Sequence, residues 1–574
     1  MDILMLMGGA FVAYLIAYHT YGKFLARKIF KLNDMHPVPS KTHRDGRDFV
    51  PTRRGILFGH HFTSIAGTGP IVGPAIAIIW GWLPALLWVV FGSIFIGAVH
   101  DFGSLLVSIR NEGKSLSEIS ARYINTRVRF ACFLVVFFTV TVIIAVFVVV
   151  IASIFTLFPN SVIPVWGQIP IAVLLGRAVY AKGQNLNLST LVAVIAMYAL
   201  IVVGSKYPLT IPDFSFIPAS GIWAIILLIY AWIASVIPVT TLLQPRDYIN
   251  AWQLFVAMAL LIGGAVLSAT TSNLELAAPA VNSSLPAGTP SIFPFLFVIV
   301  ACGAVSGFHS LVGSGTSSKQ LAKESDSLFV GYGSMLLEGV LAVVVIVCVA
   351  GGIAMGLEVD GNILTGAEAW NHQYSSYIGS QGLGGKLAPV ILGAANMMAT
   401  IGIPKAIGTT LMGVFIASFA STTLDTSVRL QRYVVSELAS DFKAAPFRNR
   451  YIATSFAVVT AAALAFAEGA GATGALKLWP LFGCLNQLLA VIALLVITLY
   501  LKSCGGLKYL YTLLPFLFML IVTTWSMAGN EIKYFGDGNI LLTTFGAIVF
   551  AIGVWITIET AAVFINNDNP LPEA

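Results

Sequence analysis

The chain has 574 residues, of which 57% are hydrophobic and 10% are charged, and its mean hydropathy is +0.89. About a quarter of the residues of a soluble domain are charged, so this composition excludes a soluble protein and indicates a polytopic membrane protein. The formal net charge of +6 does not indicate nucleic-acid binding, because the basic residues lie in short loops between apolar segments rather than in one patch or stripe.

Runs of about 17 to 25 mostly apolar residues are long enough to cross a bilayer as helices. The chain contains about 15 such runs. We expect the first to be a retained span rather than a secretory signal, because Asp2 precedes it, basic residues follow it and no clear cleavage pattern is present. The predicted spans are residues 3–22, 63–80, 83–108, 129–157, 164–181, 187–205, 220–242, 249–271, 292–314, 328–356, 406–424, 450–467, 476–500, 508–528 and 541–563.

The distribution of basic residues predicts the orientation of these spans. The loop after the first span is rich in Lys and Arg between Lys23 and Arg54, which places it in the cytoplasm, the N-terminus outside and the C-terminus inside. Alternation then places inside the loops that carry Arg110 to Arg127, Arg177 and Lys182, Arg246, Lys319 and Lys323, Arg429 to Arg450, and Lys502 and Lys508.

This alternation holds only if the apolar stretch from Leu387 to Ile401 does not cross the membrane completely. The stretch contains Gly393 and Asn396 and is followed by Gly402 and Pro404, and residues of these types interrupt helices. We therefore expect a re-entrant or broken segment there, with its irregular backbone buried in protein.

The stretch from Gly59 to Pro74 reads GHHFTSIAGTGPIVGP and opens one of the predicted spans with glycine, proline, histidine and hydroxyl residues. Glycine and proline interrupt the helical hydrogen-bond ladder, and freed backbone groups at membrane depth are tolerated only where they face protein or a water-filled cavity. Discontinuous helices of this kind bind ions and small anions in secondary transporters. We therefore predict a transporter with these substrate-binding candidates: Ser64, Gly67, Thr68, Gly69 and Gly73. Gly69 and Gly73 also have the GxxxG spacing of close helix packing.

A second polar segment echoes the first. Phe62, Ser64, Gly67 and Gly69 recur in order as Phe308, Ser310, Gly313 and Gly315, and the predicted topology runs the two copies in opposite directions. Paired broken helices in inverted repeats are typical of transporters, although so short a match also arises by chance. The substrate-binding candidates of this cluster are Ser310, Gly313, Ser314 and Thr316. A third interrupted span, Ala234 to Thr241, competes as the partner of the first.

Ionisable residues inside the spans are candidates for ion coupling, because charge within a membrane is expensive and usually marks an ion path or a paired structural contact. The candidates are His60, His61, His100, Asp101, His309 and Glu338. Histidine titrates near neutral pH, which suits proton coupling. The alternatives are an interfacial pair that anchors a helix end for the first two histidines, and a buried hydrogen-bonded acid for Glu338.

Two cytoplasmic connectors, Ser115 to Asn125 and Asp425 to Lys443, mix apolar and charged residues at helical spacing and are predicted to be interfacial helices. Asp425 and Arg429 are four residues apart in the second connector. This pair is a candidate cytoplasmic gate, or else a surface ion pair.

Enzyme motifs are missing from the sequence, which contains no HExxH, no GxSxG and no P-loop. ATP-driven transport by this chain is therefore not expected, and the energy source should be an ion gradient, of protons or sodium. A channel, or a membrane-embedded enzyme or nutrient sensor, are the alternatives. No cofactor, metal or disulfide is expected, because the cysteines stand singly. The cysteines are Cys132, Cys302, Cys348, Cys484 and Cys504.

Several longer motifs resemble the carbon starvation protein family of bacterial inner-membrane carriers. They are Gly69 to Ala75, Trp80 to Trp88, Gly97 to Phe102, Gln244 to Tyr248, Gly307 to Ser310, Ser314 to Lys319, and Thr422 to Arg432. The resemblance covers nearly the whole chain. It implies a secondary transporter related to the amino acid, polyamine and organocation superfamily, with an inverted-repeat core.

Members of that family include proton-coupled pyruvate carriers and proteins assigned to peptide uptake during nutrient limitation. The resemblance therefore implies that this chain imports pyruvate or short peptides across the inner membrane, with lipid around it and no nucleic-acid partner. We expect one all-α transporter domain over residues 1–574. Within it we expect the first span and basic loop at 1–62, the transport core at 63–425 and C-terminal helices at 426–574.

Overall fold

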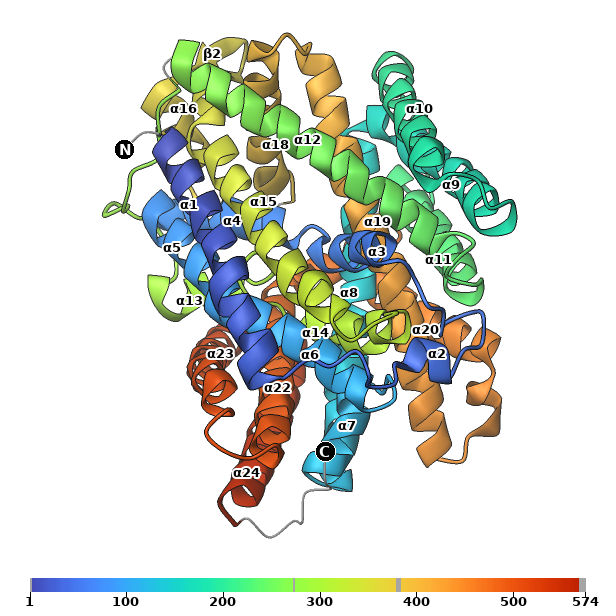
Figure 1. The fold of residues 1–574 in the computed structure, drawn as a ribbon. Coiled ribbons are helices and arrows are strands. Elements are labelled where there is room, and N and C mark those ends of the chain that lie inside the picture. The colour runs from blue at the N-terminus through green and yellow to red at the C-terminus, as the bar shows by residue number, and fades with distance from the viewer. Residues whose placement is uncertain (1–2, 272–273, 378–382, 567–574) are drawn as a thin grey trace.

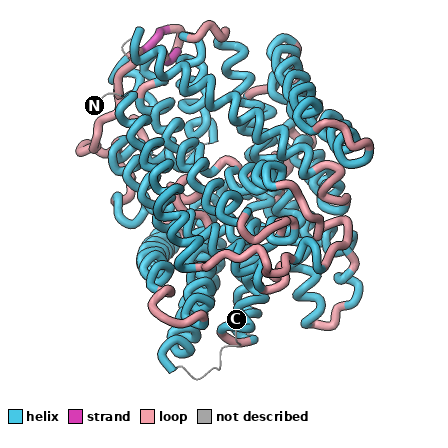
Figure 2. The backbone as a smooth tube through the Cα atoms, in the orientation of Figure 1, coloured by secondary structure: helices cyan, strands magenta, loops and turns pink. Residues whose placement is uncertain are grey.

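The computed structural model describes residues 3–271, 274–377 and 383–566, and these form a bundle of helices (Figures 1 and 2). Twelve helical segments are long and apolar enough to cross a membrane within the described residues. They are Ile3–Ile29, Trp82–Arg110, Thr126–Leu157, Pro159–Tyr180, Leu186–Lys206, Ala219–Val236, Leu243–Thr271, Leu328–Met355, Lys405–Asp441, Leu481–Ser503, Leu510–Gly536 and Ile540–Ile565. The expected fold class, an all-α polytopic membrane protein with discontinuous helices, is confirmed.

The segments are built from the following helices and strands. In chain order these are α1 (Ile3–Ala17), α2 (Pro39–Thr42), α3 (Arg54–Ala66), α4 (Gly69–Ala77), α5 (Trp82–Gly92), α6 (Ala98–Arg110), α7 (Leu116–Tyr123), α8 (Thr126–Leu157), α9 (Val162–Gly176), α10 (Leu186–Lys206), α11 (Ala219–Val236), α12 (Leu243–Thr271), α13 (Ile292–Ile299), α14 (Gly307–Gly315), α15 (Gly333–Ala350), β1 (Leu357–Val359), β2 (Asn362–Leu364), α16 (Gly366–Gln373), α18 (Leu383–Thr400), α19 (Lys405–Asp441), α20 (Arg450–Ala465), α21 (Gly474–Lys477), α22 (Trp479–Ser503), α23 (Leu510–Gly536) and α24 (Ile540–Asn566). Strands β1 and β2 form an antiparallel hairpin.

Three of the predicted spans have helical counterparts that differ from a single long helix. The span predicted at 63–80 begins earlier and is the bent pair α3 and α4. The span predicted at 292–314 is split into α13 and α14, and the span predicted at 450–467 is the 16-residue helix α20. Hydropathy therefore overcounted the continuous spans, because it averages over the breaks in two of these regions and extends the short helix α20 into its flanking residues.

The stretch from Leu387 to Ile401 is not a broken segment. Helix α18 runs continuously through Gly393 and Asn396 and ends at a turn formed by residues 401–404. It is not one of the twelve candidate spans, and it packs against α4, α12, α15 and α19. The amide of Asn396 donates hydrogen bonds to the carbonyl oxygens of Gly352 and Gly356, so this residue attaches α18 to its neighbour rather than breaking it.

The predicted interfacial helix at 425–443 is also wrong as a separate element. Residues 405–441 form one helix, α19, and most of its residues between Gly408 and Val435 are buried. Helix α8 packs along it, and these two helices lie at the centre of the bundle (Figure 1). Around them, α10 and α24 expose apolar residues such as Leu191 and Ile558, as expected for helices that face lipid. The connector at 115–125 does contain a short helix, α7.

Candidate functional site

The helix that begins at Arg54 breaks at Gly67, as the glycine and proline pattern predicts. Helix α3 ends at Ala66, and Gly67 has a φ of +48°, a conformation that is accessible to glycine but rare for other residues. Helix α4 starts at Gly69 with Pro70 in its first turn, where a proline lacks no hydrogen bond that the helix needs. The two halves are bent by 42°.

A second break lies against the first. Residues 300–306 between α13 and α14 are not helical, and Cys302 belongs to this segment. A Cβ atom added to Gly69 would lie 2.2 Å from both Cβ and Sγ of Cys302, and one added to Gly73 would lie 2.8 Å from the carbonyl oxygen of Ile299. The two irregular segments are therefore in direct contact, and glycine is what lets them approach so closely.

The internal echo does not align these two breaks. Its register pairs Gly67 with Gly313 and Gly69 with Gly315, but Gly313 and Gly315 are helical residues of α14. The break comes earlier, before Gly307. The third candidate, Ala234 to Thr241, connects two separate spans, α11 and α12, rather than interrupting one.

A cavity of about 410 Å³ lies beside the first break. Thr68, Gly69 and Gly73 line it, together with Cys302 from the second break and Lys386 from α18. Residues of α8, α13, α21, α22, α23, α24 and the loop at 288–290 also line it. Pockets of about 300–1,000 Å³ are typical of small-molecule sites, so this cavity has the size for a small solute.

Ser64 and Gly67 lie behind the lining of this cavity, where α19 holds the end of α3. The hydroxyl of Thr423 donates to the carbonyl oxygen of Ser64 at 3.2 Å, and the hydroxyls of Ser64 and Thr426 are 3.1 Å apart. The bond from Thr423 gives a partner to a carbonyl group near the end of α3, and the contact between the two hydroxyls attaches the side chain of Ser64 to α19.

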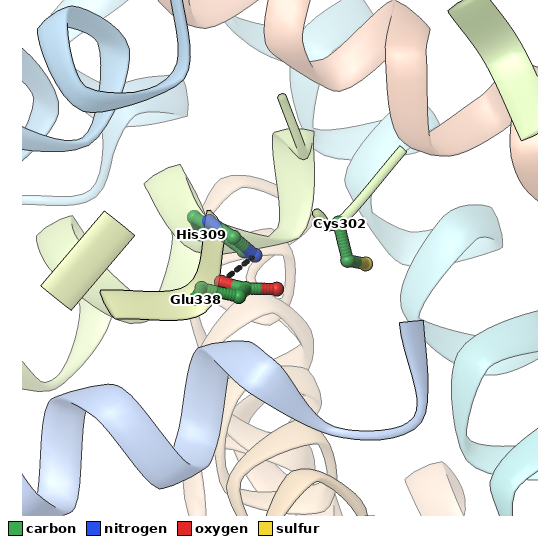
Figure 3. Close-up of side chains that lie close together, drawn as sticks. All are labelled: Cys302, His309 and Glu338. Atoms are coloured by element: carbon green, nitrogen blue, oxygen red, sulfur yellow. Dashed lines mark ion pairs between the residues drawn. The ribbon is translucent and has the colours of Figure 1, made fainter. Parts of the chain in front are cut away.

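A buried group of ionisable side chains joins α6, α14 and α15. Asp101 is hydrogen-bonded to His100 Nδ1 at 2.7 Å through one oxygen and to His309 Nδ1 at 2.9 Å through the other. The other ring nitrogen of His309 lies 3.5 Å from the carboxylate of Glu338 (Figure 3), whose oxygens make no hydrogen bond within the described residues. The structure brings four of the six ion-coupling candidates, His100, Asp101, His309 and Glu338, into one buried group.

Cys302 lies next to His309 and Glu338 in Figure 3. One ligand atom of each residue lies within 4.8 Å of the others, so these three side chains could hold a transition metal ion. Asp101 would then orient the histidine from behind, as carboxylates do at many metal sites. This group could not be predicted from sequence spacing, because its members come from a break and two different helices.

His60 and His61 are not an interfacial pair, because both are completely buried in α3. His60 Nδ1 lies 2.6 Å from Asp247 of α12, and its Nε2 lies 3.3 Å from the hydroxyl of Thr316. His61 Nδ1 lies 2.8 Å from the hydroxyl of Ser317. Both histidines therefore connect the first broken helix to the segment that follows α14.

Arg246 is buried in α12, which corrects its assignment to a cytoplasmic loop. Its guanidinium forms an ion pair with Asp425 of α19 and donates to Asp247 at 3.1 Å. The hydroxyl of Tyr230 donates to Asp425 at 2.9 Å. Together with His60, these groups form a continuous polar network across α3, α11, α12 and α19.

Asp425 and Arg429 do not pair with each other. Asp425 binds Arg246, whereas Arg429 forms an ion pair with Asp48 at 2.8 Å and donates to the carbonyl oxygens of Ala234 and Ile237. Asp48 lies in the basic loop that precedes α3. Burial raises the pKa of its carboxyl, but the charges of Arg429 and Arg432 outweigh burial and hold that pKa below its ordinary value.

The second predicted cluster does not line the cavity. The carbonyl oxygen of Ser314 accepts a hydrogen bond from Ser108 at 3.1 Å, Thr316 contacts His60, and Gly313 lies close to Leu105. Ser310 bonds the carbonyl oxygen of Gly307 within its own helix. The cluster therefore lies between α3 and α6.

Sequence reasoning missed Lys386, Asp247 and the position of Cys302. Lys386 directly precedes the apolar run that begins at Leu387, so it had the signal of a basic residue at a helix end. Asp247 stands beside Arg246 in the motif Gln244 to Tyr248, and adjacent opposite charges before an apolar run were the available hint. Neither pattern distinguishes a loop residue from a buried one.

Comparisons with known proteins agree with the architecture. The family model described as carbon starvation protein CstA matches residues 2–526. The peptide transporter CstA of Campylobacter jejuni is 32% identical and aligns over 93% of this chain and 81% of its own length. The pyruvate/proton symporter BtsT of Escherichia coli is 30% identical over 90% of this chain and 80% of its own length. The crystal structure of MhsT in complex with L-phenylalanine has the same fold, with a TM-score of 0.54 at 14% identity, over 84% of this chain and 99% of that chain.

Proposed function

Because the chain belongs to the carbon starvation protein CstA family, we propose that it is a proton-coupled secondary transporter that takes up pyruvate or short peptides across the bacterial inner membrane. The observation that carries the proposal is the cavity of about 410 Å³ beside the break at Gly67. Unwound backbone beside a cavity supplies the polar groups that a transported solute needs at membrane depth.

The substrate occupies this cavity in our proposal, against Thr68, Gly69 and Gly73. Ser64 and Gly67 support the break from behind. Ser310, Gly313, Ser314 and Thr316 act at a later stage, as the polar path by which the substrate leaves when the other side opens. The hydrogen-bonding contact between His60 and Thr316 supports a connection between the break and this path.

The coupling proton is carried by the group of Asp101, His309 and Glu338, with His100 as a partner. Glu338 is fully buried without a hydrogen-bond donor among the described residues, so its carboxylate form depends on the nearby histidine for compensation. A carboxyl group in such a position gains or loses a proton as its surroundings change. Cys302 lines the cavity and also lies beside His309 and Glu338, so the substrate site and the proton-carrying group are adjacent. His60 and His61 extend the proton path toward the predicted cytoplasmic side.

The gate on the predicted cytoplasmic side is formed by two ion pairs rather than one. Asp425 pairs with Arg246, and Arg429 pairs with Asp48 of the basic loop. The cavity is instead bordered by the loop at 288–290, which belongs to the predicted outer side. We infer from this a carrier that is closed toward the cytoplasm, and we keep the orientation expected from the basic loops, with the N-terminus outside and the C-terminus inside.

Uptake of labelled pyruvate and of a labelled dipeptide into proteoliposomes tests this function. We expect accumulation when an inward proton gradient is imposed and not when a sodium gradient replaces it. Glu338→Gln and Asp101→Asn should abolish gradient-driven uptake while leaving substrate exchange partly intact. The matched control is Glu468→Gln, which removes an exposed carboxylate that pairs with Lys477. Uptake that is indifferent to both gradients would exclude ion coupling.

A further inference from the structure

Lys386 is a buried lysine that has no acidic partner among the described residues. Its side chain belongs to α18 and is 4% exposed. Its ammonium group lies 4.2 Å from the centre of the Trp479 ring, which is a cation–π contact. No carboxylate of the described residues forms an ion pair with it. Burying a cation is costly unless it is paired, so this position calls for a negative group.

Lys386 lines the same cavity as the break at Gly67. Thr68 and Gly69, which line that cavity, are the first residues of helix α4. In α4, Pro70 has no N–H and the N–H of Ile71 donates to the carbonyl oxygen of Thr68, which leaves the N–H of Gly69 without an acceptor in the helix. The helix dipole also makes this end favourable for anions. Two features that attract negative charge therefore reach one cavity from separate elements, α4 and α18.

The remaining charged residues of the cavity wall do not meet this need. Lys533 and Asp537 lie at the end of α23, and both are exposed. They are of opposite sign and solvated, so they neither neutralise Lys386 nor compete with it for an anion. Val72 and Phe147 provide apolar surface that suits the rest of a small organic molecule.

We propose that Lys386 and the N-terminal end of α4 bind the carboxylate of the transported substrate, so that Lys386 determines selectivity for acids over their neutral derivatives. The proposal rests on the proposed function and adds the group that the site recognises. The carboxylate belongs either to a 2-oxo acid such as pyruvate or to the C-terminus of a short peptide. Trp479 holds the ammonium in place when the cavity has no acid in it.

Equilibrium binding to the purified full chain tests the proposal with paired probes. The first pair is labelled pyruvate and its neutral methyl ester, and the second is a labelled dipeptide and its C-terminal amide. We expect Lys386→Met to weaken binding of the acid about 10- to 100-fold, the effect of losing a charged hydrogen bond. Binding of the neutral partner should not change. Lys386→Arg should keep most of the preference for the acid, because arginine retains both the charge and the contact with the ring.

The control is Lys405→Met, which removes an exposed lysine at the start of α19. It should bind both members of each pair as the wild type does. Whichever acid shows the loss in Lys386→Met identifies the source of the carboxylate. Two results would overturn the proposal: acid binding by Lys386→Met that equals the wild type, or an equal loss for the acid and its neutral partner. If the wild-type protein binds neither acid, the proposed function itself fails, and the role of Lys386 fails with it.

Discussion

Gly69→Ala tests the contact between the two breaks. The added Cβ atom would lie 2.2 Å from Cβ and Sγ of Cys302, whereas carbon atoms pack best at about 3.5–4.0 Å. The two segments must therefore separate by about 1.3 Å or more at this point. Overpacking of this kind destabilises a folded protein by about 1–3 kcal/mol. We expect a lower melting temperature in detergent and loss of most uptake in proteoliposomes.

A second substitution separates this contact from other effects. Cys302→Gly removes both atoms that the new methyl group would strike, and the nearest remaining atom, the Cα of residue 302, is 3.6 Å away, an ordinary contact. The double variant Gly69→Ala with Cys302→Gly should regain stability, whereas Gly69→Ala with Cys302→Ala should not, because alanine keeps the Cβ atom. Gly55→Ala is the control, since no atom lies within 4 Å of its added Cβ. Wild-type stability of Gly69→Ala, or rescue by alanine and glycine alike, would refute the contact.

Further predictions concern the break and the gate. Gly67→Ala should destabilise the protein by more than about 1 kcal/mol in thermal melts, because its φ is +48° and the added Cβ would lie 2.7 Å from the hydroxyl of Thr423; an unchanged melting temperature would contradict a left-handed break. Asp425→Asn removes one of the two carboxylates that pair with the buried Arg246, leaving Asp247, and should cost about 3 kcal/mol, measured in the same melts; a loss under about 1 kcal/mol would show that the pair is not buried. Asp48→Asn should lower the melting temperature equally at about pH 5 and about pH 8. The pKa of Asp48 is lowered in the folded protein, so its contribution is present above the ordinary carboxyl pKa and is lost only in stronger acid. A difference that grows between these two pH values would contradict that ion pair.

The break at Gly67 could be predicted because its cause is local. Gly67, Gly69, Pro70 and Pro74 interrupt a helix whatever surrounds them, and the structure places the irregular residues among them. The partner of the break could not be predicted in the same way. Cys302 is far away in the sequence, and nothing in the segment around it marks a contact with Gly69.

The positions and partners of charged residues were also predicted wrongly. Hydropathy and the positive-inside rule treat Arg246 as a loop residue, because they assign no partner to a charge. In the structure Asp425 and Asp247 lie beside it, so the guanidinium is buried in a helix. For the same reason Asp425 and Arg429, which have helical spacing, were expected to pair with each other. The tertiary structure offers each a better partner, and this depends on where α12 and the loop before α3 pack.

The echo between Ser64 and Ser310 shows a limit of short internal matches. Both segments lie next to a break, because α3 ends at Ala66 and residues 300–306 before α14 are not helical. The register of the echo is wrong, because the residues that match Gly67 and Gly69 are helical in α14. Small residues occur where helices pack closely, as at Gly313 beside Leu105, as well as where a helix breaks, so a match of small residues does not by itself predict a break.

The claim that the cavity beside Gly67 holds the substrate is tested most directly by the reactivity of Cys302. This thiol lines the cavity and is partly exposed, and Cys504 is the other partly exposed cysteine, so the measurement uses a Cys504→Ser background. We predict that a maleimide labels Cys302 and that a saturating concentration of the transported acid slows this labelling at least tenfold. An unchanged labelling rate in the presence of an acid that the same preparation transports would contradict the account.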